Sequence, residues 1–204
     1  MEGAVCRRGV RLALRDWTER DLPTLESWLQ PGHAWQDLDG PYFGRPSSEE
    51  LERVLERYRN AVGSARLAVP RRELAIARIE DDRLLGRVNR YWQSRETHWL
   101  SLGITIFDPG QWGRALGFEA LGLWSEYVLD KLPDVIRLDL RTWSGNERMI
   151  RLAGKLGYVE EARFRKARVV EGEYYDSVGY GILREEWRER YPDGFAADLA
   201  RMLD

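Results

Sequence analysis

The chain has few side chains that bind a metal through nitrogen or sulfur. Cys6 is the only cysteine among 204 residues, and His33 and His98 are the only histidines. A single cysteine allows no disulfide within the chain and no cysteine-based metal site. Because zinc and non-haem iron are usually held by cysteine or histidine, we expect no metal site in this protein.

Long apolar runs are also missing. The longest, such as Leu102–Phe107 and Leu138–Leu140, have the length of strands and fall far short of the ~18 residues that cross a bilayer. The first ten residues include Arg7 and Arg8 but lack the apolar centre of a signal peptide. We therefore expect a cytoplasmic protein with no membrane partner.

The sequence has no excess of basic charge. It contains 32 Lys and Arg residues against 34 Asp and Glu residues, for a formal net charge of −2. Nucleic-acid-binding domains usually carry a clear basic excess, so we expect no nucleic-acid partner. With 43% hydrophobic and 32% charged residues, the composition is that of an ordinary globular protein. Its length is enough to bury a core without disulfides or metals.

Hydrophobic periodicity predicts a mixed order of strands and helices. We expect a strand over 11–17, helices over 18–29 and 48–61, strands over 73–79, 84–91 and 99–107, a helix over 112–129, a strand over 135–140, a helix over 146–156, strands over 159–170 and 174–183, and a tail helix over 192–203. The order indicates an α/β protein in which an antiparallel block leads into a strand–helix–strand unit. We expect one domain over 1–204, with a core at 11–187 and a helical tail at 188–204.

One segment has the composition of an anion-binding loop. Ile104–Ala120 reads ITIFDPGQWGRALGFEA, in which a strand and a turn lead into a helix through Gly113, Ala115 and Gly117. Small residues let backbone N–H groups approach a ligand, and the start of a helix favours negative charge. Such a unit can hold a pyrophosphate, with Arg114 adding a cation. The spacing alone fits a tight packing turn equally well, and no Walker or dinucleotide fingerprint is present.

The same segment resembles the acyl-CoA loop of the GNAT superfamily, Arg/Gln-x-x-Gly-x-Gly/Ala. It is most similar to the branch of ribosomal-protein alanine acetyltransferases, whose loop commonly reads Trp-Gly-Lys-Gly-x-Gly/Ala-x-Glu-Ala, where Trp112–Ala120 reads WGRALGFEA. Further matching stretches lie, in the family's order, at 14–22, 146–161, 176–178 and 182–187. The resemblance covers about residues 11–187.

The resemblance implies the GNAT fold: a single mixed sheet with antiparallel N-terminal strands and a central parallel pair that splays apart, flanked by helices. It also implies acetyl-CoA as co-substrate and direct transfer of its acetyl group to a primary amine within a ternary complex. Backbone N–H groups in the gap between the strands would bind pantetheine and stabilise the thioester carbonyl. The expected cofactor-binding residues are Thr105, Ile106, Phe107, Trp112, Gly113, Arg114, Ala115, Leu116, Gly117 and Asn146.

Three positions depart from the family pattern. Ala115 replaces the usual glycine, and we expect the loop to stay open if Ala115 has a negative φ. Met149 replaces the serine thought to protonate the leaving CoA thiolate, and Ala153 lies near the position of the tyrosine that other members use. The general acid is therefore unassigned, with Tyr158 and Ser144 as nearby hydroxyls. An alternative function stays open: a catalytically weak module that binds acyl-CoA and acts as a sensor or scaffold.

Two residues are candidates for the chemistry itself. Asn146 could contact the pantetheine arm, or it could simply cap the helix that follows it. Asp139 could accept the proton of the acceptor amine, or it could belong to a row of charged residues on a solvent-facing strand, between Arg137 and Arg141.

The acceptor is an amine that the sequence does not name, either a peptide N-terminus or a small molecule. Segment 30–46 is rich in glycine, proline and aromatic residues, as binding loops often are. We expect Trp35, Tyr42 and Trp143 to form the acceptor pocket, where aromatic rings can hold a cation, or else to belong to the core. The last hairpin and the tail could build a homodimer surface.

Overall fold

Eight strands form one mixed sheet in the computed structural model, which describes residues 3–62 and 68–203. Their order across the sheet is β1-β2-β3-β4-β5-β6-β8-β7. The strands are β1 (Val5–Arg8), β2 (Leu12–Arg15), β3 (Glu73–Arg78), β4 (Leu84–Ser94), β5 (Trp99–Ile106), β6 (Arg137–Trp143), β7 (Val159–Val170) and β8 (Glu173–Leu183). The expected strands are confirmed, and β1 is an additional strand that the sequence pattern did not predict.

Six α-helices accompany the sheet in the described part of the chain. They are α1 (Leu22–Leu29), α2 (Ser48–Val62), α3 (Leu116–Lys131), α4 (Glu147–Leu156), α5 (Arg184–Arg190) and α6 (Phe195–Leu203). The segment between α1 and α2 contains two short 3₁₀ helices, η2 (Ala34–Asp37) and η3 (Pro41–Phe43). None of these helices is long and apolar enough to cross a membrane.

The centre of the sheet contains the expected parallel pair, and the two strands separate after a short contact. Strands β5 and β6 pair only from Leu100 with Leu138 to Leu102 with Leu140. Beyond that point β5 continues to Ile106, still paired with β4, while β6 continues to Trp143, paired with β8. All other neighbouring strands are antiparallel. The mixed sheet with a splayed central pair is therefore confirmed.

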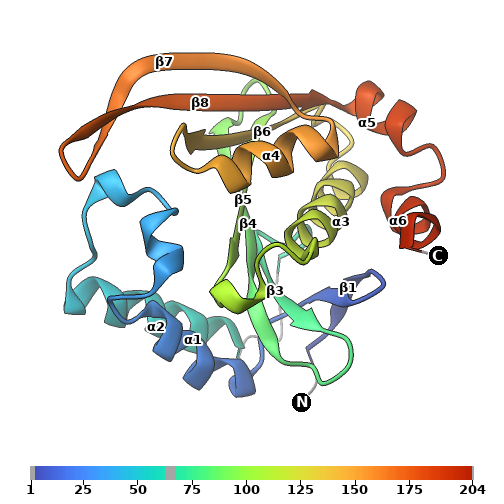
Figure 1. Cartoon of the computed structure of the whole chain (residues 1–204). Helices are drawn as coiled ribbons and strands as arrows, with labels where there is room; N and C mark the ends of the chain where they lie inside the picture. Colours follow the sequence, from blue (N-terminus) through green and yellow to red (C-terminus); the bar gives the residue numbers. More distant parts are fainter. Residues whose placement is uncertain (1–2, 63–67, 204) are drawn as a thin grey trace.

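The two faces of the sheet are covered by different helices (Figure 1). One hydrophobic cluster joins α3, α4 and α6 to the sheet, and Trp124 at its centre is fully buried and donates from Nε1 to the Asn89 carbonyl at 2.8 Å. A second cluster joins α1, α2 and η2 to the opposite side of β3 and to the end of β5. Neighbouring residues of β3 belong to different clusters, Leu74 to the first and Ala75 to the second, as strand alternation requires.

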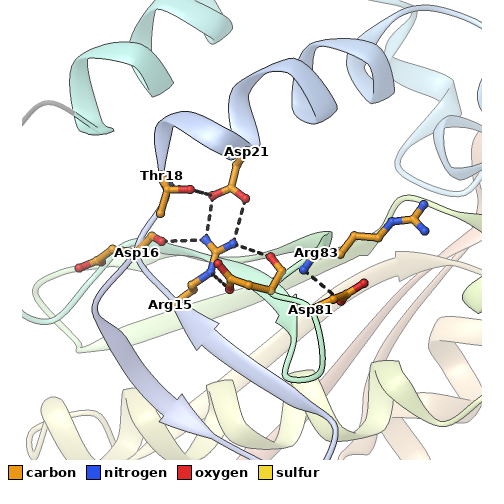
Figure 2. Close-up of polar contacts among 7 residues, drawn as sticks. Arg15, Asp16, Thr18, Asp21, Asp81 and Arg83 are labelled. Carbon is orange, nitrogen blue, oxygen red and sulfur yellow. Dashed lines mark hydrogen bonds and ion pairs between the residues drawn. The ribbon is translucent and has the colours of Figure 1, made fainter. Parts of the chain in front are cut away.

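A buried ion pair fixes the start of α1 against the sheet. Arg15 of β2 forms two hydrogen bonds to the carboxylate of Asp21, at 2.7 and 2.9 Å, and a third to Asp82 at 2.6 Å (Figure 2). Asp21 also accepts the backbone N–H of Thr18 at 2.8 Å, which fixes the turn that leads into α1. Both partners of the Arg15–Asp21 pair are almost fully buried. The direction in which α1 leaves the sheet is thereby defined, and with it the path of segment 30–46.

The β7–β8 hairpin arches over one end of the sheet, and its tip lies above the segment that links α1 to α2 (Figure 1). The pairing between the two strands is irregular: Phe164 pairs with Ser177 and Arg168 with Tyr175, so four steps along β7 match two along β8. Within this bulge Lys166 has φ 54°. Its backbone N–H donates to Asp176 at 2.9 Å, which anchors the bulge to β8.

The tail helix docks on α3 through a close ring contact. Phe195 is fully buried, and its ring covers Gly122 of α3 so closely that a Cβ there would lie 2.0 Å from the ring carbon Cζ. The helix begins at Phe195 and not at Pro192 as expected, because a turn at Gly194 with φ 91° precedes it. The tail is thus an integral part of the core.

Candidate functional site

A cavity of about 1070 Å³ opens where β5 and β6 separate. Its floor is formed by β5 and β6, one side by the loop and helix start at 111–118 together with α4, and the other side by segment 35–43. Residues of the β7 hairpin and of the C-terminal tail complete the wall. The cavity therefore collects segments from both ends of the chain around the gap in the sheet.

Two residues of the loop before α3 have an unusual backbone conformation. Gly113 has φ 76° and Ala115 has φ 60°, both in the left-handed region. The condition under which we expected the loop to stay open, a negative φ at Ala115, is therefore not met, and this alanine occupies a conformation that favours glycine. These reversals also explain why α3 begins at Leu116 rather than at 112, as the apolar pattern predicted.

The start of α3 forms part of the cavity wall. Leu116, Gly117 and Phe118 all line it, and the first N–H groups of a helix have no partner within the helix. Five cations also line this part of the wall: Arg11, Arg148, Arg151, Lys155 and Arg190. Helix start and cations together form a site suited to a phosphate-bearing ligand. Arg114 is exposed and does not line the cavity, and its carbonyl accepts a hydrogen bond from Arg11 at 2.8 Å.

Trp112 connects this loop to the end of β5. Its indole Nε1 donates to the Ile106 carbonyl at 2.9 Å, and the guanidinium of Arg148 lies 5.1 Å from its ring centroid. The loop is held open at its other end by Asp108, whose carboxylate accepts the Gly110 N–H at 2.8 Å. Trp112 and Gly113 both line the cavity, as expected for residues that contact a cofactor.

The edge of β5 offers backbone groups to the cavity. Thr105 and Ile106 line it, and β6 pairs with β5 no further than Leu102, so this side of the strand faces the gap. Phe107 is placed differently from what the sequence suggested. It is fully buried, it does not line the cavity, and its N–H donates to the Leu85 carbonyl at 3.0 Å.

Asn146 connects α4 to the acceptor side of the cavity. Its Oδ1 accepts the Met149 N–H at 3.1 Å, which is the geometry of a helix cap, and its Nδ2 donates to the Leu38 carbonyl at 3.1 Å. The same carbonyl accepts Nε1 of Trp143 at 3.2 Å. Asn146 lines the cavity as well, so the structure combines the cap with a position beside the site.

The nearby hydroxyls considered as acids lie away from the cavity. Tyr158 is buried, and its hydroxyl exchanges a hydrogen bond with Ser125 at 2.8 Å, while burial raises its pKa. Ser144 accepts the Asp176 N–H at 2.9 Å. Neither lines the cavity, whereas Met149 does and Ala153 is buried beneath it.

Asp139 is only 4% exposed, so it does not belong to a solvent-facing row. Its Oδ1 accepts from Arg137 at 2.6 and 2.9 Å, and its Oδ2 lies 3.7 Å from Arg141. It does not line the cavity. Its carboxylate is therefore held within an ion-pair network on the sheet.

The three aromatic residues expected at the acceptor pocket all line the cavity. Trp35 and Trp143 are also buried, and each packs edge-on against another ring, Phe107 and Tyr175 respectively. Tyr42 is half-buried and packs against Phe43 in a tilted arrangement, with ring centroids 4.7 Å apart. The two tryptophans are therefore both core residues and residues of the cavity wall.

Several residues of the wall were not singled out from the sequence. Asp39 lines the cavity, with its carboxylate 4.0 Å from Arg87, and burial raises its pKa although Arg87 opposes the rise. Arg168 of β7 lines the cavity from the opposite side, and Leu199 and Met202 do so from the tail. The only local signal for Asp39 was its place in the glycine- and aromatic-rich loop. No group of three or more His, Cys, Asp or Glu residues in the described ranges is arranged to hold a metal.

Comparisons with known proteins agree with this architecture. The model of the acetyltransferase (GNAT) domain family matches residues 11–159. An uncharacterized N-acetyltransferase, YokL, from a Bacillus subtilis prophage is 26% identical over 180 residues, which cover 88% of this chain and 93% of the relative.

Solved structures have the same fold. A GNAT acetyltransferase from Bacillus anthracis superposes with a TM-score of 0.67 at 18% identity, covering 87% of this chain and 98% of the other. The spermidine/spermine N-acetyltransferase SpeG of Vibrio cholerae, in mutant forms, gives 0.63 at 18% identity, covering 88% and 99%. The family match extends over most of the chain and includes the splayed strands and the loop before α3. The chain belongs to the GNAT family of acetyltransferases.

Proposed function

We propose that this protein transfers the acetyl group of acetyl-CoA directly to a primary amine. The observation that carries the proposal is the meeting, in one cavity, of the β5 edge that β6 no longer pairs beyond Leu102, lined by Thr105 and Ile106, with the helix start at Leu116–Phe118. A ligand with amides at one end and a pyrophosphate at the other matches these two features, and acetyl-CoA has both.

The cofactor would lie along the cavity from the tail to the gap in the sheet. Its pyrophosphate would bind the N–H groups from Gly113 to Gly117, and the cations of α4 would surround its phosphates. The pantetheine amides would bind the free edge of β5. The acetyl carbonyl would then rest against backbone N–H groups that stabilise the negative charge it develops during attack.

Asp39 is our candidate for the group that receives the amine proton. It is the one carboxylate among the described residues that line the cavity. When the neutral amine attacks the thioester carbon, the carbon–nitrogen bond forms, the carbon–sulfur bond breaks, and the nitrogen loses a proton. The side chain of Asp39 is 53% exposed, so an incoming amine can reach it, and partial burial raises the pKa of its carboxyl, which makes the carboxylate a better proton acceptor.

A second function stays in view because of Met149 and Ala153. Neither can donate a proton to the CoA thiolate, and Tyr158 and Ser144 lie outside the cavity. A weakly catalytic module that binds acyl-CoA would have this arrangement. An enzyme with this arrangement would release CoA as the thiolate, which then takes its proton from water.

The acceptor and the branch of the family belong to the same proposal. The loop sequence Trp112–Ala120 supports the ribosomal-protein alanine acetyltransferase branch, in which the acceptor is a protein N-terminus. The fold neighbours include an enzyme named for spermidine and spermine. A peptide N-terminus and a small-molecule amine are therefore both tested below.

The first test is calorimetric titration of the protein with acetyl-CoA. We expect micromolar affinity in the wild type and its loss in Gly113→Glu and Gly117→Glu, where a carboxylate would repel the pyrophosphate. Gly117 has ordinary backbone geometry, and a Cβ there would meet only Leu152 at 3.4 Å, so its loss of binding would not reflect strain. Gly154→Glu is the matched control, because this glycine of α4 is exposed and faces open space.

Thiol release then separates the two functions. Release of CoA with an added peptide or amine, at a rate above hydrolysis, supports the enzyme. Tight binding without any amine-dependent release supports the weakly catalytic module. Failure of the folded wild type to bind acetyl-CoA would exclude both.

A further inference from the structure

Positively charged side chains greatly outnumber negatively charged ones in the lining of the cavity. Among the described lining residues, Asp39 is the single carboxylate, whereas seven side chains are cationic. The seven are Arg11, Arg141, Arg148, Arg151, Lys155, Arg168 and Arg190. Arg87, 4.0 Å from Asp39, offsets even the one negative charge. The phosphates of the cofactor account for the cations around α3, α4 and the tail, but they leave two further arginines of the lining, Arg168 and Arg141.

The first of these is Arg168 of β7. The bulge between Phe164 and Arg168 interrupts the strand alternation, and such bulges redirect the side chains that follow them. The guanidinium of Arg168 lies 4.4 Å from the centroid of the Tyr42 ring and 5.7 Å from that of Phe43. It therefore sits directly over the aromatic wall of the acceptor end.

Arg168 has no anionic partner in the described chain. No carboxylate lies within ion-pair distance of it, and its buried Nε has no hydrogen-bond acceptor. Its polar interaction is with the hydroxyl of Tyr42. Burial raises the pKa of that hydroxyl, and the positive charge of Arg168 opposes the rise. Because Nε is covered, a ligand oxygen would be bound by the terminal nitrogens of the guanidinium, which have no carboxylate partner.

The second is Arg141 of β6, just beyond the point where the central strands separate. Its nearest carboxylate oxygen, on Asp139, is 3.7 Å away, beyond hydrogen-bond distance, and Asp139 is already bonded to Arg137. Arg141 is supported by the Trp99 ring, with 5.5 Å from its guanidinium carbon to the ring centroid. Its N–H donors are therefore also available to the cavity that it lines.

We propose that the acceptor carries an anionic oxygen group, a carboxylate or a phosphate, in addition to its amine, and that Arg168 and Arg141 bind this group. This inference rests on the proposed acetyl transfer. The amine would then lie toward Asp39 and the anion toward the arginines. Guanidinium groups bind such oxyanions through paired, charge-assisted hydrogen bonds. A polyamine carries only positive charge and would be repelled by this end of the cavity.

The test measures binding of the acetylated products to the CoA-bound protein, so it does not depend on turnover. Two matched pairs are titrated by calorimetry. The first is N-acetyl-phenylalanine against its uncharged amide, and the second is N-acetyl-phosphoethanolamine against N-acetylethanolamine. We expect the anionic member of at least one pair to bind about ten-fold or more tightly than its neutral partner. The pair that shows the preference identifies the carboxylate or the phosphate as the group.

The variants assign that preference to the two arginines. Arg168→Gln and Arg141→Gln should each remove most of it, while affinity for acetyl-CoA stays within about two-fold of the wild type. Arg165→Gln is the matched control, because Arg165 is an exposed arginine of the same bulge and lies outside the cavity lining. It should keep the full preference.

Three results would overturn the proposal while leaving the acetyltransferase assignment intact. They are equal binding within both pairs, no binding of any anionic product at millimolar concentration, and a preference that survives in both arginine variants. Faster CoA release with spermidine than with any anionic amine would do the same. Failure of acetyl-CoA itself to bind is a separate result, which removes the proposed function first.

Discussion

The carboxylate of Glu119 binds both the backbone and the side chain of Arg11. One oxygen of the buried carboxylate accepts the Arg11 N–H at 2.8 Å, and the other accepts the guanidinium Nε at 3.1 Å. The first oxygen also accepts the Leu12 N–H at 2.9 Å. Because Glu119 lies in the first turn of α3, the start of β2 is bonded directly to the helix end that we assign to the pyrophosphate.

Replacing Glu119 by glutamine keeps its shape and removes its charge. The amide NH₂ would face donors, so at least one hydrogen bond is lost from a fully buried site, and we expect the free energy of unfolding to fall by about 2 to 3 kcal/mol in a urea titration. Glu147→Gln is the control, since that residue forms only an exposed ion pair with Arg151. Equal stability of the two variants would show that the Glu119 contacts contribute little.

Ala115 should be more stable as glycine. Its φ of 60° is costly for any residue with a Cβ, so Ala115→Gly is expected to raise the free energy of unfolding by up to about 1 kcal/mol. The reciprocal change, Gly113→Ala at φ 76°, should lower it by about the same amount, although a Cβ there meets no atom within 4 Å. Thermal unfolding of both variants checks the pair, and a loss of stability in Ala115→Gly would contradict the assigned backbone geometry.

Gly122 is required for the tail helix to dock. A methyl group at this position would overlap the Phe195 ring, so Gly122→Ala should destabilise the protein by about 1 to 3 kcal/mol and expose the turn before α6 to limited proteolysis. Gly154→Ala, in open space on α4, should instead be neutral or slightly stabilising, because alanine favours helix. Unchanged protease resistance in Gly122→Ala would show that the tail can shift without undocking.

Asp39 should control the acidic side of the rate profile. Burial raises the pKa of its carboxyl, with Arg87 opposing the rise, and only the deprotonated form accepts a proton. The rate therefore falls as the pH drops through this raised pKa. Asp39→Asn should lower kcat by about 100-fold and remove that dependence, while the titration of the amine itself stays the same.

Asp37→Asn provides the comparison for that experiment, because Asp37 lies two residues before Asp39, at the end of η2, is largely exposed, and does not line the cavity. Near-ultraviolet circular dichroism would show whether either variant disturbs the fold around Arg87. If both aspartates give the same small change in rate and pH profile, another group or water takes the proton.

The elements with strong local signals were predicted well. Helix α4 runs from Glu147 to Leu156, close to the expected 146–156. Its ends were predictable because the side-chain cap at Asn146 and the left-handed Gly157 each act within one turn of the chain. The start of α3 was placed four residues early, since the apolar pattern continues through Trp112 while the backbone reverses at Gly113 and Ala115. The spacing of apolar residues carries no information about the sign of the backbone angle φ.

The parts of the site that were missed depend on distant contacts. Arg168 reaches the cavity only because two extra residues of β7 shift its register, and a strict alternation along the strand does not reveal such a bulge. Segment 30–46 is tied to the end of β6 and to the α4 cap at the Leu38 carbonyl, whose donors lie 105 and 108 residues away. No local pattern encodes contacts of that range.

That carbonyl joins the two sides of the cavity that we assign to the two substrates. Trp143 and Asn146 both donate to it, from the end of β6 and the cap of α4, while Leu38 belongs to the opposite wall, next to Asp39. If acetyl-CoA binds as proposed and shifts the α4 cap, this shared oxygen is the point through which the shift would reach the wall that we assign to the amine. Thermodynamic reciprocity would then require the amine to alter the affinity for acetyl-CoA by the same factor by which acetyl-CoA alters the affinity for the amine.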